Sequence, residues 1–200
     1  MPGRANPFDW SGGHPALDFV NTLDERPSDA PVENLATYAD LVKFAALARL
    51  IDASTSNRLR RLEGPNCSRI ARRSRALREH LHAILAAAHA GKKVPKGFLD
   101  AIATEVRRAH AARALVATAA SSPFRHNWIS PSSPEIPLHA CALAIETLLV
   151  TADHKRIRKC GASDCDVYFI DTSKAHRRRW CSMQNCGNRE KQRRWRSGAD

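Results

Sequence analysis

The sequence lacks long apolar runs. No apolar segment of eighteen residues occurs in the 200 residues, and the stretch from Met1 to Asp18 has no basic segment followed by seven apolar residues. A membrane span and a secretory signal are therefore not expected. We predict a soluble cytoplasmic protein that has no membrane partner.

Motifs that mark catalysis are also missing. The chain has no glycine-rich phosphate loop, no paired-carboxylate motif and no pattern typical of a serine, histidine and aspartate triad. It has no internal repeat and no long low-complexity tract. We therefore predict that the protein is not an enzyme.

The C-terminal segment, residues 155–200, has too few large apolar side chains to form a hydrophobic core of its own. A segment of this size folds alone only when another source, such as metal binding, supplies the missing free energy. The first 150 residues are rich in Ala, Leu, Val and Ile and can bury a core unaided. This contrast predicts two domains, residues 1–152 and residues 153–200.

Four of the six cysteines stand in the C-terminal segment as two Cys-x4-Cys pairs. Cys160 pairs with Cys165 and Cys181 with Cys186, and fifteen residues separate the pairs. In a reducing cytosol, clustered cysteines ligate metals more often than they form disulfides. Each pair allows one tight turn to direct two sulfurs at a common point, which predicts one structural Zn²⁺ bound by four thiolates. An iron-sulfur centre or two disulfides are the alternatives.

Apolar residues at helical spacing predict that the N-terminal domain is mainly helical. The longest stripes run over Cys67–Ala90, Pro95–Leu115 and Leu138–Ala152. Two short strand-like pieces around Ser121–Pro123 predict a small β hairpin. Asp40 is predicted to be the N-cap of an earlier helix.

Positive charge is concentrated near the metal site. The chain carries a net charge of +12, and residues 155–200 contribute +8 of it, with thirteen Lys and Arg against five Asp and Glu. A basic module of this kind predicts a polyanionic partner, most commonly nucleic acid. By contrast, we interpret the arginines of the long helix as a solvated face, with a second nucleic-acid surface as the alternative; they are Arg69, Arg72, Arg73, Arg75 and Arg78.

A helix predicted over 187–196 is basic around most of its circumference, with Arg189, Arg193 and Arg196 on one stripe. Such a helix buries little against its own protein and suits a phosphate-lined groove. The alternative is that cations offset the charge of minus two on a zinc tetrathiolate, for which two or three would suffice. The predicted nucleic-acid contacts are Arg177, Arg178, Arg179, Arg189, Lys191, Arg193, Arg194 and Arg196.

Two tryptophans lie in this basic segment. Trp180 and Trp195 could stack on unpaired bases, which would favour RNA or single strands. We expect instead that Trp180 covers the metal site and that Trp195 packs back on the hairpin or the helical domain.

Two stretches of the sequence resemble known families. Residues 179–191 (RWCSMQNCGNREK), with residues 169–173 (FIDTS) before them, closely resemble the CGNR zinc-finger family. Residues 16–23 (ALDFVNTL) resemble the opening motif of the ABATE domain, which precedes that finger in bacterial stress-induced transcription regulators. The resemblance implies a mainly α N-terminal domain with a small β hairpin, and a C-terminal treble-clef-like zinc finger.

Together, the residues and the resemblance predict a transcription regulator whose zinc finger binds double-stranded DNA. An RNA-binding or ribosome-associated module, and a protein-interaction adaptor with zinc as scaffold, are the alternatives. One finger covers only about 600–1,000 Å² of DNA surface, which is small for recognition of a specific DNA sequence. We therefore expect a homodimer or a second contact surface.

The helical domain is then expected to serve sensing or dimerisation. Asp18, Asn21 and Thr22 are polar residues in an apolar run, and they are predicted to face a pocket for a small-molecule effector. The alternative is that they make caps and turns.

Overall fold

The protein was studied as a computed structural model, which describes residues 7–117, 123–151 and 154–196. The chain forms two compact units. One spans residues 35–150, and the other combines the residues before 35 with those from 151 onward. These units do not coincide with the predicted domains, 1–152 and 153–200, because the N-terminal segment folds together with the cysteine-rich segment.

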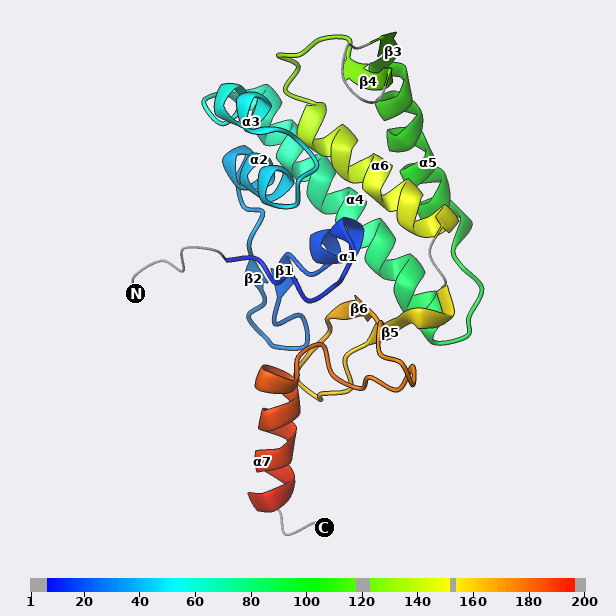
Figure 1. Ribbon diagram of the computed structural model, residues 1–200. Helices are drawn as coiled ribbons and strands as arrows, with labels where there is room; N and C mark the ends of the chain where they lie inside the picture. Colours follow the sequence, from blue (N-terminus) through cyan, green and yellow to red (C-terminus); the bar gives the residue numbers. More distant parts are fainter. Residues whose placement is uncertain (1–6, 118–122, 152–153, 197–200) are drawn as a thin grey trace. The chain divides into compact units, whose positions relative to one another are not determined.

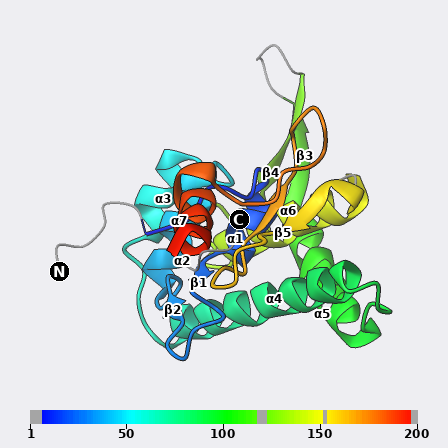
Figure 2. The ribbon, with the colours of Figure 1, turned by 90° about the horizontal axis from the view of Figure 1, so that it is seen from below.

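The unit of residues 35–150 is mainly helical and is built around one long helix, α4. Helix α5 runs alongside α4 in both views, and a two-stranded hairpin extends away from these helices (Figures 1 and 2). Its elements are α2 (Tyr38–Leu47), α3 (Ala53–Leu59), α4 (Pro65–His89), α5 (Lys96–Ala111), β3 (Arg113–Ala117), β4 (Phe124–Trp128) and α6 (Ile136–Thr151). Its core is aliphatic and aromatic, and includes Leu41, Phe44, Ile70, Leu77, Leu81, Ile102, Leu138 and Ile145.

The predicted helices and the hairpin are confirmed, with differences at their ends. Helix α5 ends at Ala111 instead of Leu115, because Arg113–Ala117 pair in antiparallel register with Phe124–Trp128. The predicted end of the last helix, Ala152, lies outside the described residues.

Within the described residues, no helix combines the length and the apolar character that a bilayer crossing needs.

The predicted N-cap at Asp40 is wrong, because Asp40 occupies the third helical position of α2. The hydroxyl of Thr37 accepts a hydrogen bond from the Asp40 N–H (3.2 Å), and the Asp40 carboxylate accepts one from the Thr37 N–H (2.8 Å). Thr37 is therefore the N-cap, and the two residues form a reciprocal capping box.

The basic face of α4 is only partly solvated. Arg73 forms ion pairs with Glu105 of α5 (2.8 Å) and with Glu135 just before α6 (2.7 Å). Arg75 donates to the backbone carbonyl of Leu35 (2.9 Å), and Arg78 is only 2% exposed. The solvated-face interpretation is therefore wrong for these three arginines, because Arg73 and Arg75 bind other parts of the helical unit and Arg78 is buried.

The second unit contains short elements and one protruding helix. They are α1 (Pro15–Val20), β1 (Leu23–Asp24), β2 (Val32–Glu33), the 3-10 turn η1 (His154–Arg156), β5 (Ile157–Lys159), β6 (Tyr168–Ile170), the π-helical turn η2 (Met183–Gly187) and α7 (Asn188–Arg196). Strands β1 and β2 pair antiparallel, as do β5 and β6. Helix α7 projects from the β5–β6 part of the unit (Figure 1).

The N-terminal segment completes the free edge of β6. The side-chain amide of Asn21 donates to the Tyr168 carbonyl (2.9 Å) and accepts from the Tyr168 N–H (3.0 Å), as a peptide of a neighbouring strand would. The Ile170 N–H donates to the Gly12 carbonyl (2.8 Å). A hairpin of two three-residue strands is marginal alone, so these bonds supply the third partner that it needs.

The other polar residues of this segment also have intramolecular partners. The buried Asp18 carboxylate accepts from the Gly12 N–H (3.0 Å), and burial raises the pKa of Asp18 to about 7. A side chain at Gly12 would place its Cβ 2.7 Å from the Asp18 oxygen, so only glycine fits there. The buried Thr22 hydroxyl donates to the Phe19 carbonyl (2.7 Å). The effector site predicted at Asp18, Asn21 and Thr22 stays a prediction.

We predict that Asn21→Ala destabilises the protein by about 2–4 kcal/mol, because it leaves a buried N–H and a buried carbonyl of Tyr168 without partners. Urea unfolding of the zinc-loaded protein measures this change. Asn57→Ala, at an exposed position of α3, is the matched control and should be nearly neutral. Equal stability of the two variants would contradict the role of Asn21.

We also predict a pH-dependent gain in stability for Asp18→Asn. The pKa of Asp18 rises from 3.8 to about 7 on folding, so ionisation opposes folding and stability from this group falls as pH rises from about 4 to about 7. The variant should match the wild type near pH 4 and exceed it by about 1–3 kcal/mol at pH 8. Unfolding curves across this range measure the difference, and a difference independent of pH would contradict the assignment.

Candidate metal centre and nucleic-acid surface

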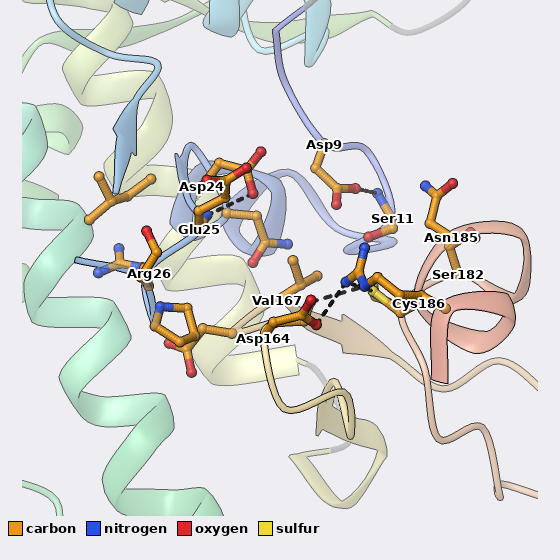
Figure 3. Close-up of a pocket in the computed structure, with 18 of the residues that line it drawn as sticks. Asp9, Ser11, Asp24, Glu25, Arg26, Asp164, Val167, Ser182, Asn185 and Cys186 are labelled. Carbon is orange, nitrogen blue, oxygen red and sulfur yellow. Dashed lines mark hydrogen bonds and ion pairs between the residues drawn. The ribbon is translucent and has the colours of Figure 1, made fainter. Parts of the chain in front are cut away.

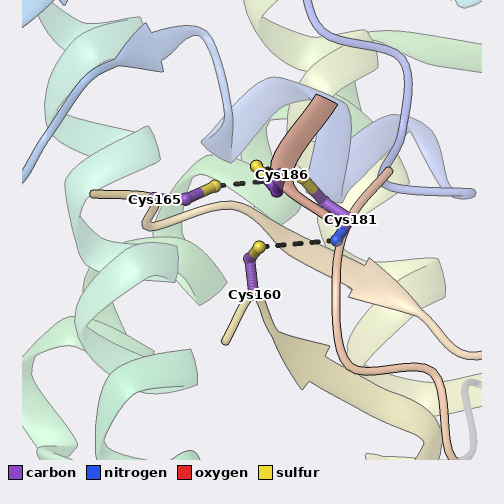
Figure 4. Close-up of side chains that lie close together, drawn as sticks. All are labelled: Cys160, Cys165, Cys181 and Cys186. Carbon is purple, nitrogen blue, oxygen red and sulfur yellow. Dashed lines mark hydrogen bonds between the residues drawn. The ribbon is translucent and has the colours of Figure 1, made fainter. Parts of the chain in front are cut away.

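The four cysteines of the C-terminal segment converge on one point, as predicted. Their sulfur atoms lie within 4.8 Å of one another and are directed toward a common centre (Figure 4). Cys181 Sγ is 3.5 Å from Cys186 Sγ and 3.8 Å from Cys165 Sγ. Four sulfurs bound tetrahedrally to zinc at about 2.3 Å lie about 3.8 Å apart. The cluster therefore fits a zinc ion.

Two turns bring these sulfurs together. The turn between β5 and β6 is closed by the bond from the Cys160 N–H to the Val167 carbonyl (2.8 Å), and it presents Cys160 and Cys165. Cys181 lies two residues before η2, and Cys186 lies within η2, two residues before α7 begins. The Ser182 hydroxyl accepts from the Asn185 N–H (3.3 Å) and caps the turn between them.

The electrostatics of the cluster favour a bound cation. Hydrogen bonds from the Cys165 and Cys181 thiols lower the pKa of Cys160 to about 2, while the same contacts raise the pKa of Cys181. Without a metal the group therefore favours one negative sulfur shared among neighbouring thiols. Zn²⁺ supplies the charge that lets all four sulfurs be thiolates together.

Polar groups next to the sulfurs orient them. The Cys181 N–H donates to Cys160 Sγ (3.4 Å), and the Arg189 guanidinium donates to Cys186 Sγ (3.3 Å). Arg189 is itself held by the Asp164 carboxylate (2.9 Å). Such contacts around the ligands fix their geometry and tune metal affinity.

Apolar side chains pack against the cluster. Buried Val167 and Phe169 pack against the cysteines, and the partly buried Trp180 packs on them as well. The prediction for Trp180 is thus confirmed. The prediction that Trp195 packs back on the protein is wrong, because its side chain is 85% exposed on α7.

Asp171, in the middle of the FIDTS segment, has a structural role that could not be predicted from the sequence. One oxygen of the buried carboxylate accepts from the Ser173 hydroxyl (2.6 Å) and N–H (2.9 Å), and the other accepts from the Arg178 N–H (2.9 Å). Hydrogen bonding to Ser173 lowers the pKa of Asp171 to about 2. Asp171 thereby fixes the loop that leads from β6 to Cys181.

Three of the arginines predicted to contact nucleic acid are engaged within the protein. Arg178 donates to the carbonyls of Trp180 (3.0 Å) and Cys181, and its guanidinium lies 4.5 Å from the centre of the Phe169 ring. Arg193, like Arg189, binds Asp164 (2.6 Å). One stripe of α7 thus forms ion pairs with the Cys160–Cys165 turn. No residue of α7 is buried, so the helix buries little against its own protein, as expected.

The other predicted cations remain at the surface. Arg177, Arg179, Lys191, Arg194 and Arg196 are exposed, and Arg179 lies beside the Trp180 ring at 5.5 Å. The single carboxylate in residues 174–196, Glu190, forms an ion pair with Arg193 (2.7 Å). This surface is therefore strongly positive.

The sequence was also compared with models of known protein families. Residues 13–152 match the model described as "ABATE: Putative stress-induced transcription regulator", and residues 156–198 match the CGNR zinc finger. No curated protein matches the chain. The matched finger and the four-sulfur cluster together identify the metal as one structural zinc ion.

We predict that Asp164→Asn weakens zinc binding by about tenfold, because Arg189 loses the partner that holds it against Cys186. Competition with a chromophoric chelator measures this affinity. Asp166→Asn, which removes the same charge from the same turn but pairs with Lys159, is the matched control and should change affinity by less than about twofold. Equal losses in both variants would show that only net charge matters.

Proposed function

Because the chain belongs to the ABATE family and carries a CGNR zinc finger, we propose that it regulates transcription by binding duplex DNA through this finger. The family supports regulation, and the finger supplies a folded basic module. For this role we propose a cytoplasmic protein.

The observation that carries the proposal is the surplus of cations over carboxylates in residues 174–196. This segment has nine Lys and Arg residues and one carboxylate. Arg178, Arg189 and Arg193 are engaged internally, and they suffice to offset the charge of a zinc tetrathiolate. The six others are exposed and exceed what the metal site needs; they are Lys174, Arg177, Arg179, Lys191, Arg194 and Arg196.

The proposed contact face is the side of α7 that points away from the zinc turn. With 3.6 residues per turn, Lys191, Arg194 and Trp195 share one side of the helix, opposite Arg189 and Arg193. The ion pairs of Arg189 and Arg193 anchor α7, so its exposed opposite side is proposed to approach a phosphate-lined groove. Arg177 in the preceding loop and Arg196 near the end of α7 extend the positive surface.

Zinc has a structural role in this proposal, and no catalysis is assigned. Four protein thiolates leave no open position for water or substrate. One finger covers only about 600–1,000 Å² of DNA, so we propose that the helical unit serves dimerisation or effector sensing.

The exposed Trp195 favours a second candidate function, RNA binding. A tryptophan between Arg194 and Arg196 can stack on an unpaired base, as in proteins that bind single strands. Competition between duplex DNA and structured RNA of equal length separates the two functions, and preference for RNA would replace the DNA proposal.

We predict that the affinity for duplex DNA falls by about two to three decades between 50 and 200 mM salt, as expected for about four to six phosphate contacts. The triple variant Arg177→Ala, Lys191→Ala, Arg196→Ala should lower the slope of log affinity against log salt by about 2 to 3. Fluorescence anisotropy with a labelled duplex measures both effects, and zinc content should stay at the wild-type value.

A matched control removes three exposed cations from the helical unit. Arg60→Ala, Arg61→Ala, Lys92→Ala changes the net charge equally, so its salt slope should stay close to that of the wild type. A flat salt response of the wild type, or equal slopes for both triple variants, would contradict binding by the finger.

A further inference from the structure

The zinc site is open on one side. A pocket of about 1180 Å³ lies between the N-terminal segment and the finger, within one compact unit, and Cys165, Cys181 and Cys186 form part of its wall (Figure 3). Cys165 is partly exposed, whereas the other three cysteines are at most 5% exposed. Because these cysteines line the pocket, a small solute in the pocket lies next to the metal site.

The reachable sulfur has a partner within range. Cys165 Sγ lies 3.8 Å from Cys181 Sγ, and the two residues come from different Cys-x4-Cys pairs. A disulfide needs about 2.05 Å, so the two sulfurs must approach by about 1.8 Å, which small movements of two turns can provide. Cys186 differs, because its sulfur accepts a hydrogen bond from the Arg189 guanidinium (3.3 Å), and both residues line the pocket.

We propose that Cys165 is a modification site for small hydroperoxides and that Cys181 is the thiol that resolves the modification. The Cys165 thiolate attacks a peroxide oxygen, so that an S–O bond forms while the O–O bond breaks. The departing oxyanion takes a proton from water. The Cys181 thiolate then attacks Cys165 Sγ, which forms the S–S bond and expels hydroxide, and this hydroxide is also protonated.

In total, the two thiolates lose two electrons and the peroxide gains them. Hydrogen peroxide yields two water molecules, and an organic hydroperoxide yields one water and one alcohol. A disulfide between Cys165 and Cys181 removes two of the four ligands. The remaining two cannot hold a structural zinc ion, and the small unit that depends on it loses its folding free energy. The inference rests on the zinc site alone and does not require nucleic-acid binding.

The test treats zinc-loaded, full-length protein with hydrogen peroxide and follows zinc release with a chromophoric chelator. Dimedone traps sulfenic acid, and mass spectrometry maps the modified residues. We expect the first dimedone adduct at Cys165, then one zinc released per chain together with a Cys165–Cys181 disulfide. Dithiothreitol and added zinc should restore the starting state. A first adduct at any other cysteine, or zinc release without this disulfide, would overturn the proposal.

Variants test whether the peroxide reaches Cys165 through the pocket or oxidises the cysteines without using this route. Asn185 lines the pocket and is exposed, so Asn185→Phe should narrow the opening and slow zinc release by about threefold or more. Asn57→Phe, at an exposed position of α3, is its control. The double variant Cys67→Ala, Cys141→Ala removes the buried cysteines outside the site and should release zinc at the wild-type rate. A rate that Asn185→Phe leaves unchanged would contradict the proposed route.

Discussion

Repulsion among four crowded sulfurs is the constraint on which the C-terminal part of this protein depends. The sulfurs lie within 4.8 Å of one another, and they can all be thiolates only when a cation lies between them. Few apolar side chains pack against the sulfurs, chiefly those of Val167, Phe169 and Trp180. Zinc therefore supplies both the charge balance and most of the free energy that orders the finger.

The zinc finger does not form its sheet alone, because residues of the N-terminal segment bind the free edge of β6. Asn21 and Gly12 occupy the edge of β6, and Asp18 fixes Gly12 in turn. The ALDFVNTL motif thus acts on the structure of the zinc unit, although in sequence it lies more than 130 residues before Cys160, the first of the four clustered cysteines. A change in this segment would reach the metal site through hydrogen bonds to one strand.

Local features of the fold could be predicted from the sequence, whereas partners distant in the chain could not. Cysteine spacing predicted the metal cluster, and helical periodicity predicted α4, α5 and α6, because both are set by neighbouring residues. The roles of the individual arginines could not be predicted in this way. Arg189 and Arg193 carry the same charge as Lys191, and only the position of Asp164, about 25 residues earlier, commits them to the protein itself. Arg73, which pairs with Glu105 and Glu135, and Asn21, which binds Tyr168, likewise become structural through contacts that helical periodicity does not predict.

X-ray absorption at the zinc edge, combined with elemental analysis of the purified protein, tests the central claim most directly. The account predicts one zinc per chain with four sulfur neighbours at about 2.3 Å. Substoichiometric zinc in a protein whose finger is fully folded, or a first shell that contains oxygen or nitrogen, would contradict it.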